Sequence, residues 1–258
     1  MCPWARFSGG EKLVCHVLLV ESDTGLVLVD SGFGTHDMQE PRSRLGVARH
    51  VIKPVLEPAE TAHAQVVARG FDPADVRHIV LTHLDLDHAG GLSDFPDARV
   101  HLLREEYRAG TSPPTLRERQ RYQSAQWRHG PRWSPVDVAG EEWFGFPAVR
   151  SLDGLDERIL LIPLVGHSRG HAGVAVDTGN GWVLHAGDAY YHRGQVPAPG
   201  SPAVEVPKLS LLVQRQIAFD DSQRAANTQR LAELATANSG TVRVFPAHDA
   251  VELDALRR

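Results

Sequence analysis

Hydrophobic residues along the chain fall in short runs separated by turn-forming residues. Short runs rich in Val, Ile and Leu are typical of buried strands. They predict strands at residues 13–20, 26–30, 78–82, 100–103, 158–164, 172–178, 182–185 and 242–245. The first two runs flank Ser22-Asp-Thr-Gly25, a sequence typical of a hairpin turn. The pattern therefore predicts a fold with a large share of β-structure.

Fewer segments show helical periodicity. Residues 222–237 are the clearest amphipathic stretch, residues 60–69 predict a second helix that ends at Gly70, and a third begins at residues 104–108. Residues 35–60 hold three prolines and little periodicity, which predicts a loop with at most a helical turn. Strands interleaved with helices indicate an α/β or α+β fold, and we expect residues 1–258 to form a single domain.

Composition restricts the compartment and the partners. Two cysteines, Cys2 and Cys15, have neither the number nor the spacing of a disulfide framework, which suits a reducing interior. The N-terminus has no apolar stretch typical of a signal peptide, and no apolar run is long enough to cross a membrane. We therefore expect a cytoplasmic protein that binds no membrane. The net charge of −5 argues against nucleic acid as a partner.

Acidic residues and histidines gather where predicted strands end. The strand at 78–82 runs into His83-Leu-Asp-Leu-Asp-His88, and later strands are followed by His167, Asp188 and His248. Imidazole and carboxylate ligands without a thiolate suit Zn²⁺, Fe²⁺ or Mn²⁺ and argue against a purely structural zinc site. Seven ligands are too many for one ion. Two ions about 3.5 to 4 Å apart, bridged by a carboxylate and a water, would use all of them.

These motifs together resemble the metallo-β-lactamase superfamily. They are Thr82-His-Leu-Asp-Leu-Asp-His-Ala-Gly-Gly91, Gly166-His-Ser-Arg-Gly-His171, Gly187-Asp188 and Ala247-His248, and Asp30-Ser-Gly-Phe-Gly34 is similar to that family's early turn. The resemblance implies a four-layer αββα sandwich with metals at one sheet edge. It also implies the ligands, which are His83, Asp85 and His167 for the first ion, Asp87, His88 and His248 for the second, and Asp188 as the bridge.

Asp85 departs from the superfamily's commonest pattern, HxHxDH, which has histidine in its place. Two divalent ions with Asp85, Asp87 and Asp188 sum to +4 − 3 = +1, where the usual pattern gives +2. We therefore expect the first ion to be a weaker Lewis acid. The resemblance implies two divalent metal ions, with zinc as the expected metal. The harder oxygen ligand makes iron or manganese the alternative in one or both sites.

Within the superfamily, the chain is most similar to N-acyl homoserine lactonases, because Tyr191 follows Asp188 by three residues as it does in those enzymes. The resemblance implies a dinuclear metal-dependent hydrolase of a lactone or another small ester, in which a metal-bridging hydroxide attacks the carbonyl. Tyr191 would hydrogen-bond the developing oxyanion, and Asp87 would carry a proton to the leaving alkoxide. The partner is then a small-molecule substrate.

Three other functions stay open. The acidic Asp85 is similar to the Glu that flavodiiron proteins carry at this position, so one alternative is a diiron protein that handles or senses oxygen. Phosphodiester hydrolysis is the second, and the net charge argues against it. A non-enzymatic binding module is the third, and the complete ligand set argues against it. The sequence leaves the oligomeric state open, with a homodimer among the states it allows.

Further residues have candidate supporting roles. Asp30 is expected either to hold a ligand histidine in its tautomer or to cap its turn. His171 is expected to orient the His167 loop or to pack in the core, and His185 to be a core histidine. The segment around 104–135 is expected to be a basic and aromatic insertion. It is either a solvated helix face or a lid that binds an acyl chain or an anionic substrate.

Overall fold

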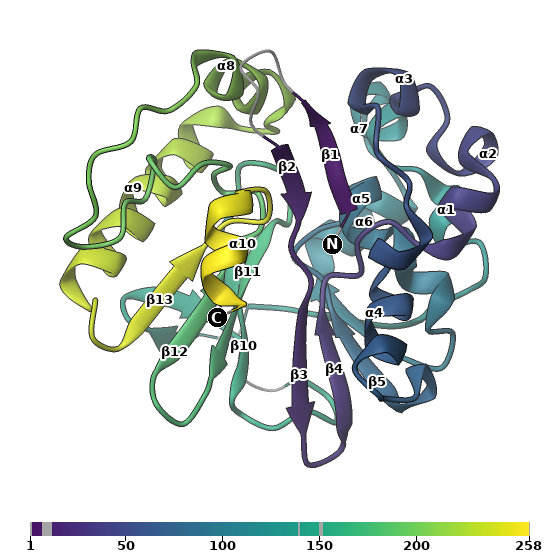
Figure 1. The fold of residues 1–258 in the computed structure, drawn as a ribbon, viewed down its shortest axis with the longest axis horizontal. Helices are drawn as coiled ribbons and strands as arrows, with labels where there is room; N and C mark the ends of the chain where they lie inside the picture. The colour runs from purple at the N-terminus through teal and green to yellow at the C-terminus, as the bar shows by residue number, and fades with distance from the viewer. Residues whose placement is uncertain (1, 7–11, 139, 150–151, 258) are drawn as a thin grey trace.

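Two β-sheets pack face to face, and helices cover their outer faces (Figure 1). The computed structural model describes residues 2–6, 12–138, 140–149 and 152–257. The first sheet has the strand order β3-β4-β5-β6-β7 and the second has the order β10-β11-β12-β13. The αββα sandwich that the sequence predicted is confirmed.

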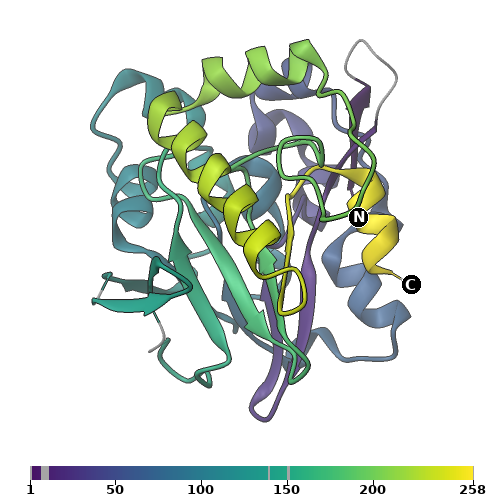
Figure 2. The ribbon, with the colours of Figure 1, turned by 90° about the vertical axis from the view of Figure 1, so that its left-hand side faces the viewer.

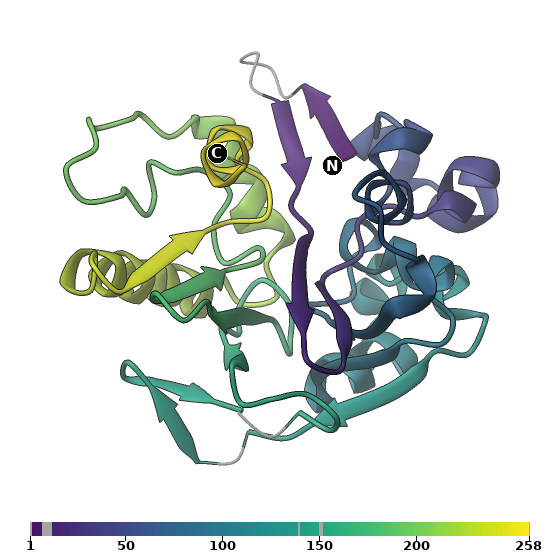
Figure 3. The same ribbon diagram turned by 60° about the horizontal axis from the view of Figure 1, so that its bottom comes forward.

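The first sheet begins with an antiparallel hairpin and continues with parallel strands. β3 and β4 pair antiparallel through the turn at Ser22 and Gly25, as predicted, and β4 to β7 pair in parallel. Its strands are β3 (Leu18–Ser22), β4 (Gly25–Val29), β5 (Val76–Val80), β6 (Arg99–Leu103) and β7 (Arg132–Val136). Figure 3 shows this hairpin at the centre, between the second sheet and the helices of the N-terminal half.

The second sheet places three strand ends at the same edge. β10 and β12 both run antiparallel to β11, and β13 runs parallel to β12, so β10, β12 and β13 share one direction. The strands are β10 (Ile159–Pro163), β11 (Ala172–Asp177), β12 (Trp182–His185) and β13 (Val242–Phe245). Two small hairpins pair β1 (Cys2–Arg6) with β2 (Lys12–Cys15) and β8 (Glu141–Trp143) with β9 (Phe146–Ala148).

The helices are mostly short. The α-helices are α1 (Thr35–Gln39), α2 (Pro41–Leu45), α3 (Ala48–Ile52), α4 (Ala62–Ala68), α5 (Leu86–Ala89), α6 (Arg104–Thr111), α7 (Leu116–Arg121), α8 (Lys208–Ile217), α9 (Asp221–Ala237) and α10 (Ala250–Leu256). The 3₁₀ turns are η1 (Pro58–Glu60), η2 (Pro73–Asp75), η3 (Gly90–Asp94) and η4 (Ser124–Trp127). Among the described helices, none combines the length and the apolar character that a bilayer crossing requires.

Alternating side chains explain the four layers. Along β4, Val27 and Val29 face the second sheet, whereas Leu26 and Leu28 pack with α4 on the outer side. Along β10, Ile159 and Leu161 face the first sheet, and Leu160 and Ile162 pack against α9. Figure 2 shows α9 lying across the outer face of the second sheet. Both sheets are therefore covered on both faces, which accounts for strands that are apolar throughout.

The structure corrects several expected elements. The expected strand at 13–20 is two strands, β2 and β3, because the chain leaves one pairing and enters another at His16. Residues 35–60 hold more than the single helical turn expected within a loop, because α1, α2, α3 and η1 all lie there. Two of them, α2 and η1, begin at a proline, which suits the first helical position. The segment expected as an insertion holds α6, α7 and η4, but its last residues belong to β7 of the first sheet.

Candidate metal centre

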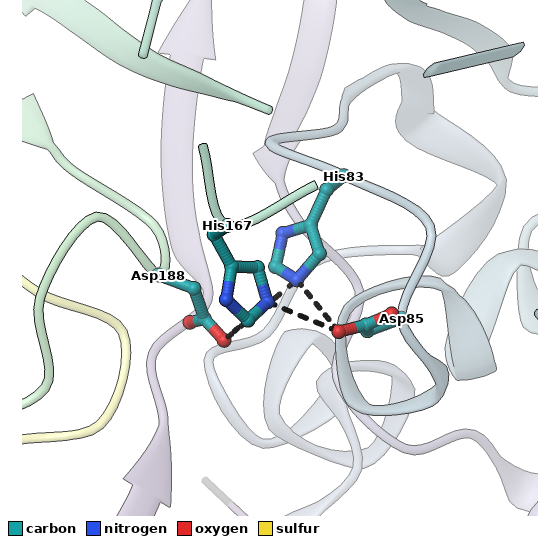
Figure 4. A group of neighbouring side chains, drawn as sticks. All are labelled: His83, Asp85, His167 and Asp188. Atoms are coloured by element: carbon teal, nitrogen blue, oxygen red, sulfur yellow. Dashed lines mark hydrogen bonds and ion pairs between the residues drawn. The ribbon is translucent and has the colours of Figure 1, made fainter. Parts of the chain in front are cut away.

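The first ligand cluster joins three separate strand ends. His83 and Asp85 follow β5, His167 follows β10, and Asp188 follows β12. Oδ2 of Asp85 lies 3.4 Å from Nε2 of His83 and 3.1 Å from Nε2 of His167. Oδ2 of Asp188 lies 3.2 Å from the same nitrogen of His167 (Figure 4). The described side chains thus offer two imidazoles and two carboxylates around one point.

The second ligand cluster lies beside the first and contains Asp87, His88, His248 and again Asp188. Oδ2 of Asp87 lies 3.0 Å from Nε2 of His88 and 3.7 Å from Nε2 of His248. Oδ1 of Asp188 lies 2.9 Å from Nε2 of His248 and 3.4 Å from Nε2 of His88. Asp188 therefore gives one oxygen to each cluster, which is the geometry of a bridging carboxylate.

The donor atoms fit divalent metal ions. Nε2 of His83 and Nε2 of His88 are buried and have no hydrogen-bond partner among the described residues. Leaving a buried polar atom unpaired is costly unless a ligand or an ion satisfies it. All seven residues that the sequence indicated are brought together here, and nitrogen and oxygen donors of this kind suit first-row transition metals.

Asp30 supports histidines of both clusters. Its carboxylate accepts a hydrogen bond from Nδ1 of His88 at 2.8 Å, and it accepts two more from the backbone N–H and Oγ1 of Thr82. Because the Thr82 hydroxyl donates to Asp30, it accepts from Nδ1 of His83 at 2.9 Å. Both rings therefore keep Nε2 free for a metal. The predicted contact of Asp30 with a candidate ligand histidine is thus present, at His88.

Asp30 also has an unusual backbone. It is buried and adopts φ = +58°, a left-handed conformation that only a few non-glycine residues tolerate. Its contacts with Thr82 and His88 hold it in that conformation, and strain of this kind gathers at functional sites.

Two histidines that are not candidate ligands shape the turn after β12. Nε2 of His171 accepts from the backbone N–H of Asp188, and its Nδ1 donates to the carbonyl of Leu164. His185 accepts from the backbone N–H of Gly187. Gly187 itself has φ = +53°, and a Cβ there would lie 2.6 Å from Nε2 of His171. His171 thus orients Asp188 as well as the loop after β10, and His185 is the core histidine that the sequence predicted.

Sequence reasoning missed Arg121, the last residue of α7. Its Nε and Nη2 each lie 2.6 Å from an oxygen of Asp85, which makes a bidentate ion pair. Nη2 also lies 2.6 Å from Nε2 of His167. One signal was available, because Thr115-Leu-Arg-Glu118 is a capping-box sequence and Thr115 does cap α7. That start places Arg117 and Arg121 on the same face of the helix.

Glu106 and Cys15 were also missed as supporting residues. The buried Glu106 accepts hydrogen bonds from the backbone N–H groups of Leu84 and Gly170 and from the Ser168 hydroxyl, so it ties α6 to both loops of the first cluster. The buried Cys15 of β2 donates from Sγ to Asp87 at 3.7 Å. The sequence had indicated only that Cys15 is not part of a disulfide framework, and gave no sign that it contacts a candidate ligand.

The electrostatic environments of the clusters differ. Burial by itself would raise the pKa of Asp85, but the charge of Arg121 holds it well below its usual value. Burial, followed by the charge of Arg121, lowers the pKa of His167 to about 4. In the second cluster burial would lower the pKa of His88, but the Asp87, Asp188 and Asp30 carboxylates raise it well above its usual value.

Tyr191 lies between the clusters. Its hydroxyl donates to Oδ2 of Asp188 at 3.0 Å, and its ring centroid is 4.7 Å from that of His248. Burial and then the nearby carboxylates raise the pKa of Tyr191 well above its usual value, so the phenol stays protonated and remains a donor.

Comparison with known proteins gives consistent matches. The profile of the metallo-β-lactamase superfamily matches residues 10–248. The probable metallo-hydrolase Rv2300c of Mycobacterium tuberculosis is 45% identical over 240 residues, which is 93% of this chain and 76% of that protein. The N-acyl homoserine lactonase AttM of Azorhizobium caulinodans is 28% identical over 186 residues, which is 70% of this chain and 68% of that protein.

Solved structures are similar in fold. A crystal structure of a variant of AiiA from B. thuringiensis, with N-decanoyl-L-homoserine bound at the active site, superimposes with a TM-score of 0.66 at 20% identity. The match covers 95% of this chain and 84% of that one. At this identity the likeness extends to the fold, and the chemistry has to be argued from the side chains.

Proposed function

Because the chain belongs to the metallo-β-lactamase superfamily, we propose that it is a metal-dependent hydrolase with a dinuclear centre that opens a lactone or another small ester. The observation that carries the proposal is Asp188, which presents one carboxylate oxygen to each ligand cluster. The match over residues 10–248 also supports a single domain over 1–258. The substrate is a small molecule.

The proposed ligands divide as the two clusters do. His83, Asp85 and His167 would hold the first ion, Asp87, His88 and His248 the second, and Asp188 would bridge them. When bound, two divalent ions supply a hydroxide nucleophile at neutral pH and polarise the carbonyl under attack. Zinc is the metal we propose, with iron or manganese as the alternative.

Tyr191 and Asp87 would manage charge and protons. The Tyr191 hydroxyl, kept protonated by its buried surroundings, would donate to the developing oxyanion of the substrate. Asp87 belongs to the second ligand cluster, and its carboxylate would carry a proton to the leaving alkoxide. Opening a lactone needs both steps, because the oxyanion collapses by expelling the ring oxygen.

Exposed apolar side chains beside the first cluster favour an apolar substrate over a phosphodiester. Ile217 and Phe219 are more than one third exposed. Both residues are hydrogen-bonded through their backbones to residues of the site. The Ile217 carbonyl accepts from Arg121, and the Phe219 N–H donates to the His167 carbonyl. Leu211 and Leu212, which lie with Ile217 on α8, are also exposed. The exposed side chains of Ile217 and Phe219 suit contact with an acyl chain, and the Arg169 guanidinium packs on the Phe219 ring, with 4.4 Å between its Cζ and the ring centroid.

The test is an assay of purified protein against a panel of substrates, with metal content measured on the same sample. The panel holds simple γ-lactones, N-acyl homoserine lactones of increasing chain length, p-nitrophenyl esters and a bis(p-nitrophenyl) phosphate. We expect lactone opening that a chelator abolishes and zinc restores, with kcat/KM rising with acyl length. Faster cleavage of the phosphodiester, or two irons with a visible absorption band and oxygen consumption, would overturn the proposal.

A further inference from the structure

Arg121 is fully engaged inside the protein. A guanidinium has five N–H groups. Those of Arg121 point at the two oxygens of Asp85, at Nε2 of His167, and at the carbonyl oxygens of His167 and Ile217. The residue sits at the junction of α7, the loop after β10 and the end of α8. With all five groups directed at protein atoms, Arg121 offers no spare donor to an anionic substrate.

The charge of Arg121 changes the electrostatics of the centre. The sum for two divalent ions and three ligand carboxylates is +4 − 3 = +1, and Arg121 raises it to +2. That is the value for a centre with a neutral histidine in place of Asp85. An ion pair in this buried setting is held tightly, because breaking it would leave an uncompensated charge.

We propose that Arg121 is a positioning residue of the first ligand cluster, which joins Asp85 in a neutral, rigid pair that takes the place of an imidazole ligand. The inference rests on the dinuclear centre proposed above. The bidentate contact fixes the plane of the Asp85 carboxylate. It also offsets the negative charge of Asp85, so the first ion is as strong a Lewis acid as in a centre with histidine. Arg121 touches a ligand and not the reacting atoms.

The contact of Arg121 with His167 sets up a rival arrangement. Nη2 donates to the same Nε2 that an ion would use, so binding of the first ion requires Nη2, which also bonds Oδ2 of Asp85, to move away from His167. In the rival arrangement the guanidinium itself stands in for the first ion, and the protein binds one ion only. The two arrangements predict opposite effects of Arg121→Gln on binding of the first ion, which should weaken in the proposed arrangement and improve in the rival one.

The experiment compares metal content and zinc affinity of six proteins prepared with the same zinc supply. They are wild type, Arg121→Gln, Arg121→Lys, Asp85→His, the double variant Asp85→His/Arg121→Gln, and Arg119→Gln as the matched control. Arg119 lies on the same helix and is exposed, and its side chain makes no hydrogen bond or ion pair with the described residues. Zinc per chain is measured by elemental analysis, and affinity by competition with a chromophoric chelator.

We expect two ions in wild type and in Arg119→Gln. Arg121→Gln should weaken the first site about 10- to 100-fold and leave the second ion in place. Asp85→His alone leaves Arg121 as an unpaired buried charge beside the ions and should bind the first ion more weakly than wild type. The double variant restores the sum of +2 with neutral partners and should again bind the first ion as tightly as wild type. Arg121→Lys, which keeps the charge but lacks the fork, should be intermediate.

Each contrary outcome is distinct. One ion in wild type and two in Arg121→Gln would establish the rival arrangement. Two ions with unchanged affinity in Arg121→Gln would remove Arg121 from the centre while leaving the proposed function intact. No zinc in any protein would overturn the proposed function together with this inference. The second ion reports folding in each variant. If Arg121→Gln fails to fold, two ions in wild type still exclude the rival arrangement, and equal zinc affinity of Asp85→His and the double variant would remove Arg121 from the centre.

Discussion

The two ligand clusters share Asp188 but are held in place by different kinds of contact. In the second cluster each histidine donates its Nδ1 hydrogen to a fixed acceptor, His88 to Asp30 at 2.8 Å and His248 to the carbonyl of Val14 at 2.7 Å. In the first cluster Nδ1 of His167 has no hydrogen-bond partner among the described residues, and the charged Arg121 contacts the other ring nitrogen. The strand ends at Asp30 and Thr82 therefore support both clusters, and helices of the 104–135 segment contact the first cluster in addition.

The difference shows how a change of ligand is accommodated. The second cluster has the common donor set and needs no added cation. The first has a carboxylate where histidine is usual, and a cation from α7 faces it. Burial and Arg121 lower the pKa of His167 to about 4, whereas neighbouring carboxylates raise the pKa of His88 and His248 above the usual value in spite of burial. The unusual residue and its compensation are thus confined to one cluster.

The largest expected effect comes from the residue that both clusters share. Asp188→Asn removes the bridging charge, so both sites should lose affinity and kcat/KM for a lactone should fall about 1,000-fold or more, equal to about 4 kcal/mol. Elemental analysis and steady-state kinetics measure the two effects. The exposed Asp254→Asn is the control and should behave as wild type. Retention of two ions by Asp188→Asn would show that the clusters do not depend on a common ligand.

Tyr191→Phe asks whether the residue between the clusters acts on substrate or only on Asp188. Loss of the hydroxyl should lower kcat/KM about 100-fold with metal content unchanged, as for removal of one oxyanion donor. Tyr107→Phe, which removes a hydroxyl outside both clusters, is the matched control. An unaltered rate would remove Tyr191 from catalysis, and a loss of metal would make it a support for Asp188.

Asp30→Asn tests the support of the second cluster. His88 loses a charged acceptor, so the second ion should bind about 10- to 100-fold more weakly. The effect on the first ion should be smaller, because Asp30 reaches His83 only through the Thr82 hydroxyl. Stepwise release of zinc to a chelator measures both affinities. Equal weakening of both ions would mean that Asp30 supports the centre as a whole.

Glu106→Gln is the corresponding test of the first cluster. Glutamine has the shape of glutamate, but one of its carboxylate oxygens is replaced by an NH₂ group, which cannot accept a hydrogen bond. One of the backbone N–H groups of Leu84 and Gly170 then loses its acceptor, so the loops carrying His83 and His167 should become less firmly held. The first ion should be released about 10-fold more easily, and the second should be unaffected. Glu105→Gln, an exposed neighbour on α6, controls for the loss of charge. Preferential release of the second ion would contradict the division of supports.

Cys15→Ala should have the smallest effect. The thiol is a weak donor to Asp87 at 3.7 Å, so its loss should weaken the second ion only a few-fold, equal to about 1 kcal/mol. Chelator competition resolves a change of this size. A much larger loss, together with the charge-transfer band of a cobalt–thiolate bond in cobalt-loaded wild type, would show that Cys15 is itself a ligand of the second ion.

Much of the fold could be predicted because its signals are local. The apolar runs that became β4, β10 and β11 are largely buried on both faces, and those of β5, β12 and β13 are buried over at least half of their length, so each run can be recognised as a strand without knowledge of its partners. The short helices α1, α2 and α3 and the helix α8 could not be predicted in this way. Their stability comes from tertiary packing, and their exposed apolar residues, such as Val51 and Leu212, obscure the helical period.

The candidate ligands were also predictable, because a ligand must be an imidazole, a thiolate or a carboxylate and these gather at strand ends that the pattern locates. By itself the sequence determined the sandwich, the seven candidate ligands and the odd carboxylate at Asp85. Only the tertiary structure decided what faces that carboxylate. Arg121 is one of seven arginines between residues 104 and 132 and lies far from Asp85 along the chain. Charge pairing across such a separation depends on how α7 packs, and nothing local in the sequence encodes it.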